Sequence, residues 1–295
     1  MPAEIIDGKK IAAEIQAELK QRISQLQQKG ISPKLVTILV GDDPASLSYL
    51  RGITRTCGET GVLTDAAKLP ATCTQKELLD KIGELNQDSK VHGILLFLPL
   101  PKQLNALEAE SAISPDKDVD GTNPISAGKL LLGEETFFPS TPYGVQELLM
   151  RSGHNPDGKH VVIVGRSNIV GKPLIGILVQ KQRGANATVT VCHTGTKNLA
   201  EITQQADILV AAMGKAKAIG ADLVRSGTIV IDVGVNFISD PTTGKNKQVG
   251  DVDFEAVKEK AAAITPVPGG TGAVTSMMLM VNTVRAAETL SKSKG

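Results

Sequence analysis

The chain has 295 residues, of which 41% are hydrophobic and 21% are charged, and its formal net charge is +1. This length and composition are typical of a globular protein with two domains or one large α/β domain. The balanced charge leaves no basic surplus for nucleic acid, and the 2% aromatic content, without Trp, leaves few rings to stack on bases.

Cysteine spacing and hydropathy argue against disulfide-rich, metal-binding, secreted and membrane proteins. The three cysteines, Cys57, Cys73 and Cys192, are far apart and form no CxxC pair. We therefore expect neither a disulfide framework nor a metal site. The start, MPAEIIDGKK, is polar and acidic, unlike a signal peptide, and no apolar run approaches the ~20 residues of a membrane helix. We expect a cytoplasmic protein that binds neither membrane nor nucleic acid.

The first half of the chain predicts helices that alternate with strands. Residues 10–29 have apolar side chains at helical spacing, and Gly30 ends that helix. PKLVTILVG then predicts a strand, and residues 45–61, ASLSYLRGITRTCGETG, predict a helix that carries Tyr49. The amphipathic helix ELLDKIGELNQ precedes VHGILLFLPLP, an apolar run that suits a buried parallel strand. The order predicts a parallel sheet with helices on its faces.

A second domain is predicted beyond a boundary at about residues 140–158, which are rich in Pro and Gly around one helix. The segments HVVIVG, TVTVCH, ADILVAAMG and GTIVIDVGV each predict a strand. Residues 172–183 predict a helix, and GGTGAVTSMMLMVNTVRAAETL predicts a long C-terminal helix. We expect an α/β fold with domains at 1–145 and 146–270, and a helix at 271–295.

The segment VVIVGRSNIVGKP has the order strand, glycine turn, helix. A turn glycine lets the backbone approach a phosphate, and the N–H groups at a helix start favour an anion. The spacing from Gly165 to Gly171 is not the usual G-x-G-x-x-G. On this pattern alone, a tight turn without a ligand remains an alternative.

The end of the next strand favours NADP over NAD. NAD enzymes place an acidic residue there to hold the ribose 2′-hydroxyl, but this strand ends VCHTGTK without a carboxylate. Arg166, His193, Thr194 and Lys197 could instead receive a 2′-phosphate through charge-assisted hydrogen bonds. Without this context, His193 would be read as a surface-loop histidine.

Several linked motifs together resemble one family. GRSNIVGKP, TVTVCHTGTKNL, DVGVN, GDVDF and TPVPGGTGAVT resemble the NADP-binding domain of the bifunctional methylenetetrahydrofolate dehydrogenase/cyclohydrolases. LVGDDPASLSYL, GILLFLPLP and PDKDVDG resemble that family's folate domain. The motifs occur in the same order over roughly residues 3–290.

The resemblance implies an activity and an architecture. The family oxidises 5,10-methylenetetrahydrofolate with NADP, and many members hydrolyse the methenyl product to 10-formyltetrahydrofolate. It implies an N-terminal α/β folate domain and a Rossmann-like NADP-binding domain with a cleft between them. It also implies a C-terminal helix that returns to the first domain, and a homodimer.

The resemblance also implies roles for single residues. Gly165, Arg166 and Ser167 match the turn that binds NADP. Thr194 stands where Ser is common, and Val235 matches an Ile whose backbone meets the cofactor.

Two further matches concern folate. Asp120 matches the carboxylate that holds the pterin, whose edge offers N–H donors, and Tyr49 matches a tyrosine that packs along the folate's aminobenzoyl ring. From local sequence alone, Asp120 is equally a turn residue before Gly121 and Tyr49 equally a core tyrosine.

Two departures fall on the family's acid–base groups. The usual helix has Lys four residues after Tyr, where this chain has Ile53, and the usual strand has Gln where this chain has Phe97. At ~100° per residue, position 53 lies within ~40° of the Tyr49 face, whereas Arg51 and Arg55 lie more than ~100° away. No replacement for the lysine is evident.

The two departures are consistent with each other. A glutamine left without its lysine would be a poorly paired amide, and replacing both groups by apolar ones removes that cost. Smaller departures are Thr271 and Ala273, where Val and Pro are usual.

We expect an NADP-dependent methylenetetrahydrofolate dehydrogenase with weak or absent cyclohydrolase activity, because hydrolysis depends more on proton transfer than hydride loss does. The alternatives are a fully bifunctional enzyme, a non-catalytic NADP- or folate-binding paralogue, and an oxidoreductase for a less polar substrate.

Overall fold

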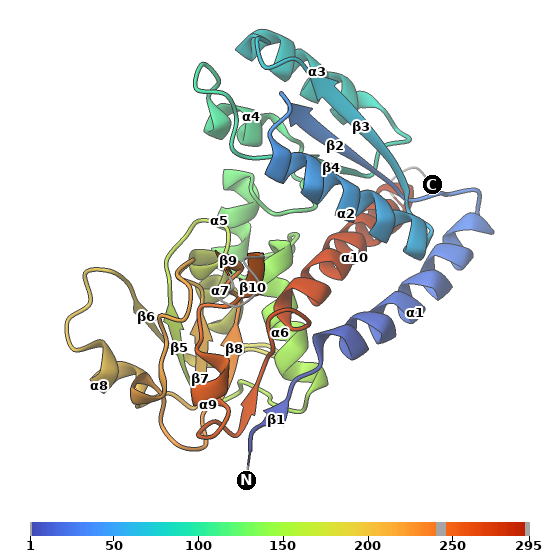
Figure 1. Cartoon of the computed structure of the whole chain (residues 1–295). Helices are drawn as coiled ribbons and strands as arrows, with labels where there is room; N and C mark the ends of the chain where they lie inside the picture. The colour runs from blue at the N-terminus through green and yellow to red at the C-terminus, as the bar shows by residue number, and fades with distance from the viewer. Residues whose placement is uncertain (1, 240–245, 293–295) are drawn as a thin grey trace. The chain divides into compact units, whose positions relative to one another are not determined.

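The computed structural model describes residues 2–239 and 246–292. It divides into two compact units. The large-sheet unit comprises the described residues among 1–13 and 141–275, and the small-sheet unit comprises those among 14–140 and 276–295. The unit boundaries fall within α1 (Gly8–Gln27) and α10 (Thr271–Lys292) and after the first residue of α6 (Ser140–Arg151). Figure 1 labels these three helices.

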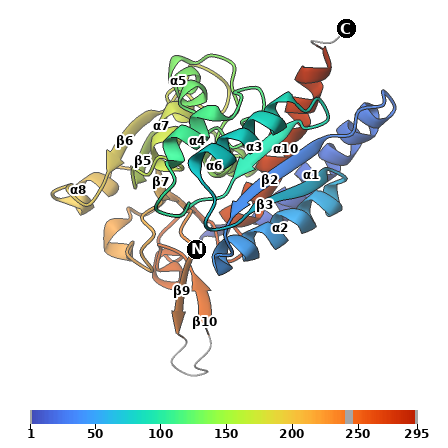
Figure 2. The same cartoon turned by 90° about the horizontal axis from the view of Figure 1, so that it is seen from above.

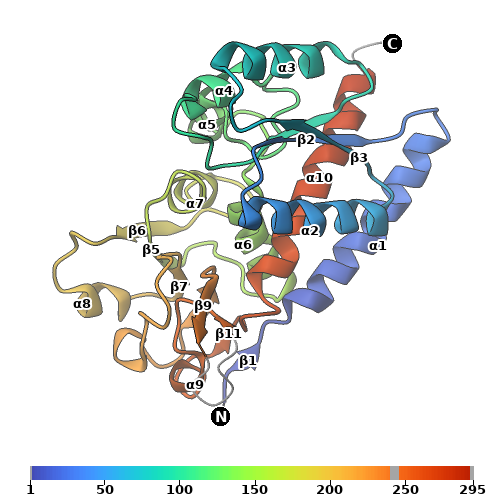
Figure 3. The same ribbon diagram turned by 45° about the horizontal axis from the view of Figure 1, so that its top comes forward.

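The small-sheet unit is built on three parallel strands in the order β3-β2-β4. These are β2 (Lys34–Val40), β3 (Leu63–Leu69) and β4 (Gly93–Leu96). The unit's own helices are α2 (Pro44–Thr60), α3 (Gln75–Gln87), α4 (Ala106–Ala112) and α5 (Pro124–Leu132). Helices α3 and α4 lie on one face of the sheet and α2 on the other (Figure 3).

Local chemistry sets the bounds of α2, the helix that carries Tyr49. Pro44 occupies the first helical position, and the Asp43 carboxylate accepts a hydrogen bond from the Ser46 N–H at 2.8 Å. The helix ends at Gly61, whose φ of +94° is a left-handed conformation that favours glycine. The predicted helix at residues 45–61 is therefore confirmed.

The second part of α10 belongs to the small-sheet unit. The Asn282 side-chain amide donates to the carbonyls of Val119 and Phe138 at 2.7 and 2.8 Å, and Arg22 pairs with Glu288 at 2.8 Å. These contacts confirm the expected return of the C-terminal helix to the first half of the chain. The last three residues of the expected range 271–295 lie outside the described residues.

The large-sheet unit has six parallel strands in the order β1-β11-β8-β7-β5-β6. They are β1 (Glu4–Ile5), β5 (His160–Val164), β6 (Thr188–Cys192), β7 (Ile208–Ala211), β8 (Ile229–Asp232) and β11 (Ala263–Ile264). The shorter elements are α7 (Gly171–Leu178), α8 (Leu199–Thr203), α9 (Phe254–Val257), a 3-10 turn (Ala221–Leu223), and the strands β9 (Asn236–Ser239) and β10 (Asn246–Val249). Strands β9 and β10 pair antiparallel and project as a two-stranded ribbon (Figure 2).

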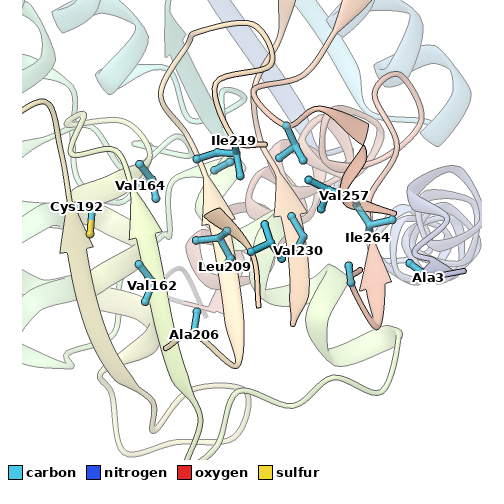
Figure 4. Close-up of a cluster of buried hydrophobic side chains, with 14 residues drawn as sticks. Ala3, Val162, Val164, Cys192, Ala206, Leu209, Ile219, Val230, Val257 and Ile264 are labelled. Carbon is cyan, nitrogen blue, oxygen red and sulfur yellow. The ribbon is translucent and has the colours of Figure 1, made fainter. Parts of the chain in front are cut away.

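Both faces of the large sheet are covered. Val162, Val164, Leu209 and Val230 point to one face, where they pack with side chains of the following loops and α9 (Figure 4). Their neighbours along the strands, such as Ile163 and Val210, point to the opposite face and are also fully buried. This two-sided burial explains the continuous apolar runs in the sequence.

Three features differ from the sequence expectations. The helix expected at 172–183 ends at Leu178, and the chain then folds back, so that the Ala187 N–H donates to the Leu178 carbonyl at 3.0 Å. Strand β1 was not expected; it pairs with β11 and so brings the N-terminal residues to the large sheet. The sequence of strand β3 does not predict a strand, because five of its seven residues are Thr, Asp, Ala or Lys. In the structure none of the seven is buried.

Among the described residues, no helix combines the length and the apolar character needed to cross a membrane.

Candidate functional site

Tyr49 and Phe97 form an aromatic pair in the small-sheet unit. Their ring centroids are 5.4 Å apart and the rings are inclined by 58°, which is a favourable tilted arrangement. Phe97 follows β4 directly and its N–H donates to the Ile38 carbonyl at 3.0 Å, so the strand fixes its backbone. Phe97 is 5% exposed and Tyr49 44% exposed. The buried Phe97 ring thus lies against the more exposed Tyr49 ring and supports it.

Ile53 lies one turn after Tyr49 and is 1% exposed. It belongs to the buried face of α2, together with Leu50, Thr56 and Cys57. Arg51 and Arg55 lie on the exposed side of the helix, and Arg55 is 3.8 Å from Glu59. The helix therefore turns its two cations away from the face on which Ile53 stands, as its periodicity predicted.

Asp120 is half-buried and is held by Ser140. Its Oδ1 accepts hydrogen bonds from the Ser140 hydroxyl at 2.8 Å and the Ser140 N–H at 3.4 Å. Burial raises the pKa of Asp120 to about 6, against the opposing effect of the Ser140 hydroxyl. Burial and then the charge of Asp120 raise the pKa of Tyr49. The two residues therefore interact electrostatically in one unit.

Two other charged residues of PDKDVDG, Lys117 and Asp118, have structural partners. The Lys117 ammonium donates to the carbonyls of Leu85, Asn86 and Asp88 at 2.7–2.9 Å. The Asp118 carboxylate accepts from the N–H groups of Thr122 and Asn123, just before α5. Asp120 also stands in the expected turn, since Gly121 has φ +63° and donates to the Asp118 carbonyl. Lys117 is thus bound to the carbonyls at the end of α3.

Gly165 lies at the switch point of the large sheet. The chain passes from β5 to β6 on one side and later returns to β7 on the other side of β5, and such switch points bind nucleotides. Gly165 has φ +139°, and a Cβ there would lie 2.1 Å from the Ala212 carbonyl oxygen after β7. A Cβ on Gly171 would lie 2.3 Å from the Gly165 carbonyl oxygen. Close packing therefore explains both glycines of the unusual spacing.

The other predicted cofactor residues follow the same edge of the sheet. Ser167 Oγ accepts from the Val170 N–H at 3.1 Å and orders the turn before α7. Arg166 and Thr194 are exposed, after β5 and β6 respectively. His193 Nδ1 accepts from the Gly195 N–H at 3.0 Å, so the ring carries its proton on Nε2 when neutral. The carboxyl ends of neighbouring parallel strands meet at this edge.

Two buried aspartates, which the sequence analysis did not single out, organise the loops at this edge. The Asp232 carboxylate accepts from the N–H groups of Gly234, Asp251 and Val252 at 2.9–3.0 Å. The Asp251 carboxylate accepts from three successive N–H groups at 213–215 and from the Asn236 side-chain amide. Burial raises the pKa of Asp232 to about 6. The sequence feature that could have indicated these aspartates is a nearby glycine, Gly234 in DVGVN and Gly250 in GDVDF.

A pocket of about 230 Å³ lies beside Asp232 in the large-sheet unit. Its lining comes from three segments: residues 232–235 after β8, Gln248 of β10, and residues 266–273 that lead into α10. Val235 is one of the lining residues and is 55% exposed. Much of the wall is backbone of glycines and prolines, which would let a flat ring approach the main chain.

No group of three or more His, Cys, Asp or Glu suitable for a metal ion occurs within residues 2–239 and 246–292.

The Ser140 hydroxyl stabilises the charged form of Asp120, so Ser140→Ala should raise the pKa of Asp120 above about 6. Titration of the Asp120 carboxyl by ¹³C NMR would measure this shift. Ser140→Thr keeps the hydroxyl and should leave the midpoint unchanged. An unchanged midpoint in Ser140→Ala would show that the hydroxyl does not control this carboxyl.

The same shift has a consequence for stability. Between 3.8 and about 6, the folded protein keeps a proton on Asp120 that the unfolded chain has released. This carboxyl therefore lowers the free energy of unfolding as the pH rises through that window. Ser140→Ala should extend the window to higher pH, which urea unfolding at several pH values would detect.

Comparison with known proteins agrees with this arrangement. Residues 139–291 match the tetrahydrofolate dehydrogenase/cyclohydrolase NAD(P)-binding domain, and residues 6–120 match the catalytic domain of the same family. The chain is 56% identical over 289 residues to the bifunctional protein FolD of Dehalococcoides mccartyi strain CBDB1, covering 98% of each chain. It is 49% identical over 287 residues to that of Moorella thermoacetica, covering 97% of this chain and 99% of the relative.

Solved structures give the same result. The FolD methylenetetrahydrofolate dehydrogenase/cyclohydrolase of Campylobacter jejuni has a TM-score of 0.92 at 44% identity, over 97% of this chain and 99% of that one. The Trypanosoma brucei enzyme, complexed with NADP and an inhibitor, has a TM-score of 0.90 at 36% identity over 98% of both chains. The chain belongs to the tetrahydrofolate dehydrogenase/cyclohydrolase family.

Proposed function

We propose that this protein oxidises 5,10-methylenetetrahydrofolate to 5,10-methenyltetrahydrofolate with NADP, and that it hydrolyses the methenyl product slowly. The observation that supports slow hydrolysis is the buried apolar pair Ile53 and Phe97 around Tyr49. The homodimer and the cytoplasmic location expected from the sequence belong to the same proposal.

The large-sheet unit fits a dinucleotide. Because Gly165 has no Cβ, its turn can pack closely against the Ala212 carbonyl at the switch point. A turn at this place in the sheet would bind a phosphate of the cofactor. Arg166 and Thr194 offer a guanidinium and a hydroxyl for a 2′-phosphate at this edge. Val235 and the glycine-rich segment would hold the nicotinamide end. When bound, NADP supplies the hydride acceptor.

The small-sheet unit supplies groups for folate. Asp120 would accept hydrogen bonds from the pterin N–H groups, and it does so best as a carboxylate, above about pH 6. Tyr49, supported by Phe97, would pack along the aminobenzoyl ring. These contacts orient the one-carbon bridge, and the lone pair of the bridge nitrogen expels the hydride without a protein base.

Hydrolysis of the methenyl product, unlike hydride transfer, requires acid–base catalysis. Water must be activated and protons must move, steps in which a positioned acid or base contributes ~10²–10⁴-fold. Ile53 and Phe97 carry no proton donor or acceptor on their side chains. A wall of this kind would orient substrate and exclude water, yet give no help to the attacking water.

A fully bifunctional enzyme is the second candidate. The relatives with 49–56% identity carry the name bifunctional protein FolD. Under this reading another group activates the water, and the apolar pair affects substrate fit alone.

A two-part assay on the purified protein separates these functions. With methylenetetrahydrofolate we expect methenyl product with NADP and much less with NAD; with methenyl substrate alone we expect hydrolysis close to the buffer rate. Rapid hydrolysis would establish the bifunctional reading. Binding of NADP and folate without turnover would favour a non-catalytic paralogue, and NADP binding without folate binding would favour another substrate.

Gly165→Ala tests the nucleotide turn. The added Cβ would meet the Ala212 carbonyl oxygen at 2.1 Å, so the turn must move, and we expect NADP affinity to fall more than tenfold. Gly158→Ala is the matched control, since Gly158 also has positive φ (+69°) but a Cβ there meets nothing within 4 Å. Calorimetric titration should show normal affinity in the control. Equal affinity in both variants would contradict the assigned turn.

A further inference from the structure

Thr271 is the first residue of α10 and is 3% exposed. Its hydroxyl donates a hydrogen bond to the Asp232 carbonyl oxygen at 2.7 Å. Asp232 is the last residue of β8. This bond therefore ties the start of a helix to the carboxyl end of a strand, and both ends line the pocket beside Val235.

A second threonine completes the attachment. Thr265 Oγ1 accepts from the Asp232 N–H at 2.7 Å, so the two threonines hold both backbone polar groups of Asp232. The ladder between β8 and β11 reaches the Val230 carbonyl, which accepts from the Thr265 N–H at 3.1 Å, and the Asp232 carbonyl lies two residues beyond that bond. Without the Thr271 hydroxyl, a buried carbonyl at the end of β8 would lose this partner, and unpaired buried acceptors are unfavourable.

The residues at 271 and 273 are the two smaller departures from the family's usual sequence. Val at position 271 could not donate this bond, whereas Pro at position 273 would restrict the backbone of the first turn. Here Ala273 leaves that φ unrestricted. In this chain the Thr271 hydroxyl, rather than a proline ring at position 273, fixes this turn.

We propose that Thr271 is a positioning residue for the cofactor: its hydroxyl holds residues 269–273 against the end of β8 and so sets the pocket wall that receives the nicotinamide half of NADP. This inference rests on the proposed function. It concerns one half of the cofactor, because the turn at Gly165 lies after β5, while the pocket lies beyond β8 on the other side of β7.

Two probes separate the two halves of the cofactor site. NADP⁺ occupies both halves, and adenosine 2′,5′-bisphosphate occupies the adenosine half alone. In Thr271→Val, calorimetry should show NADP⁺ binding about tenfold weaker, as expected for a carbonyl left unpaired, with binding of the bisphosphate unchanged. Thr271→Ser keeps the hydroxyl and should bind both probes as the wild type does.

Thr228→Val is the matched control. Thr228 is 0% exposed and its hydroxyl donates to the Ala206 carbonyl at 3.1 Å, at the opposite end of β8 from the pocket. This variant removes a similar bond and should bind both probes normally. A purely structural role of Thr271 would instead make Thr228→Val and Thr271→Val behave alike.

Three results would overturn the inference: unchanged NADP⁺ binding in Thr271→Val, equal weakening of both probes, or equal weakening of NADP⁺ in the Thr228 control. If the wild type binds neither probe, the proposed cofactor fails and the inference fails with it. If the wild type binds both and Thr271→Val matches it, the proposed function stands and only the role of Thr271 is lost.

Discussion

The loops of the large sheet depend on the rule that buried polar groups need partners. Asp232 shows this most fully: its carboxylate accepts from three N–H groups, and both of its backbone polar groups are bonded to threonine hydroxyls. These bonds join the end of β8, the turn at 250–252 and the segment that starts α10. The glycines beside the aspartates are required by the same contacts, since a Cβ on Gly250 would overlap the Asp232 carboxylate. A rigid pocket follows from satisfied hydrogen bonds.

The same rule explains the small-sheet unit. Ile53 and Phe97 are buried apolar residues, so neither side chain leaves a polar group unpaired. Phe97 then gains an aromatic contact with Tyr49 that a glutamine could not make. This contact holds the Tyr49 ring in position. Neither Ile53 nor Phe97 has a side chain that can donate or accept a proton, so this part of the fold is stabilised without acid–base groups.

The elements that could be predicted from the sequence are those with a clear periodicity of apolar residues. The Tyr49 helix, the buried strands and the long last helix follow from apolar spacing and glycine ends, and Gly165 follows from its turn. Strand β1 has only two residues, too few for a period, and its partner β11 lies more than 250 residues away. Ser140, Asp232 and Asp251 acquire their roles from partners distant in sequence. The aromatic pair likewise joins residues 49 and 97, which no local pattern connects.

The proposed limit on hydrolysis comes from the apolar pair Ile53 and Phe97. Its most direct test is the rate of methenyltetrahydrofolate hydrolysis in the double variant Ile53→Lys/Phe97→Gln, compared with the wild type and with Ile53→Lys alone. We expect the hydrolysis rate to rise about 10²-fold in the double variant, and to rise little in the single variant, whose buried ammonium lacks its amide partner. Wild-type hydrolysis that is already fast, and that the double variant does not increase, would contradict it.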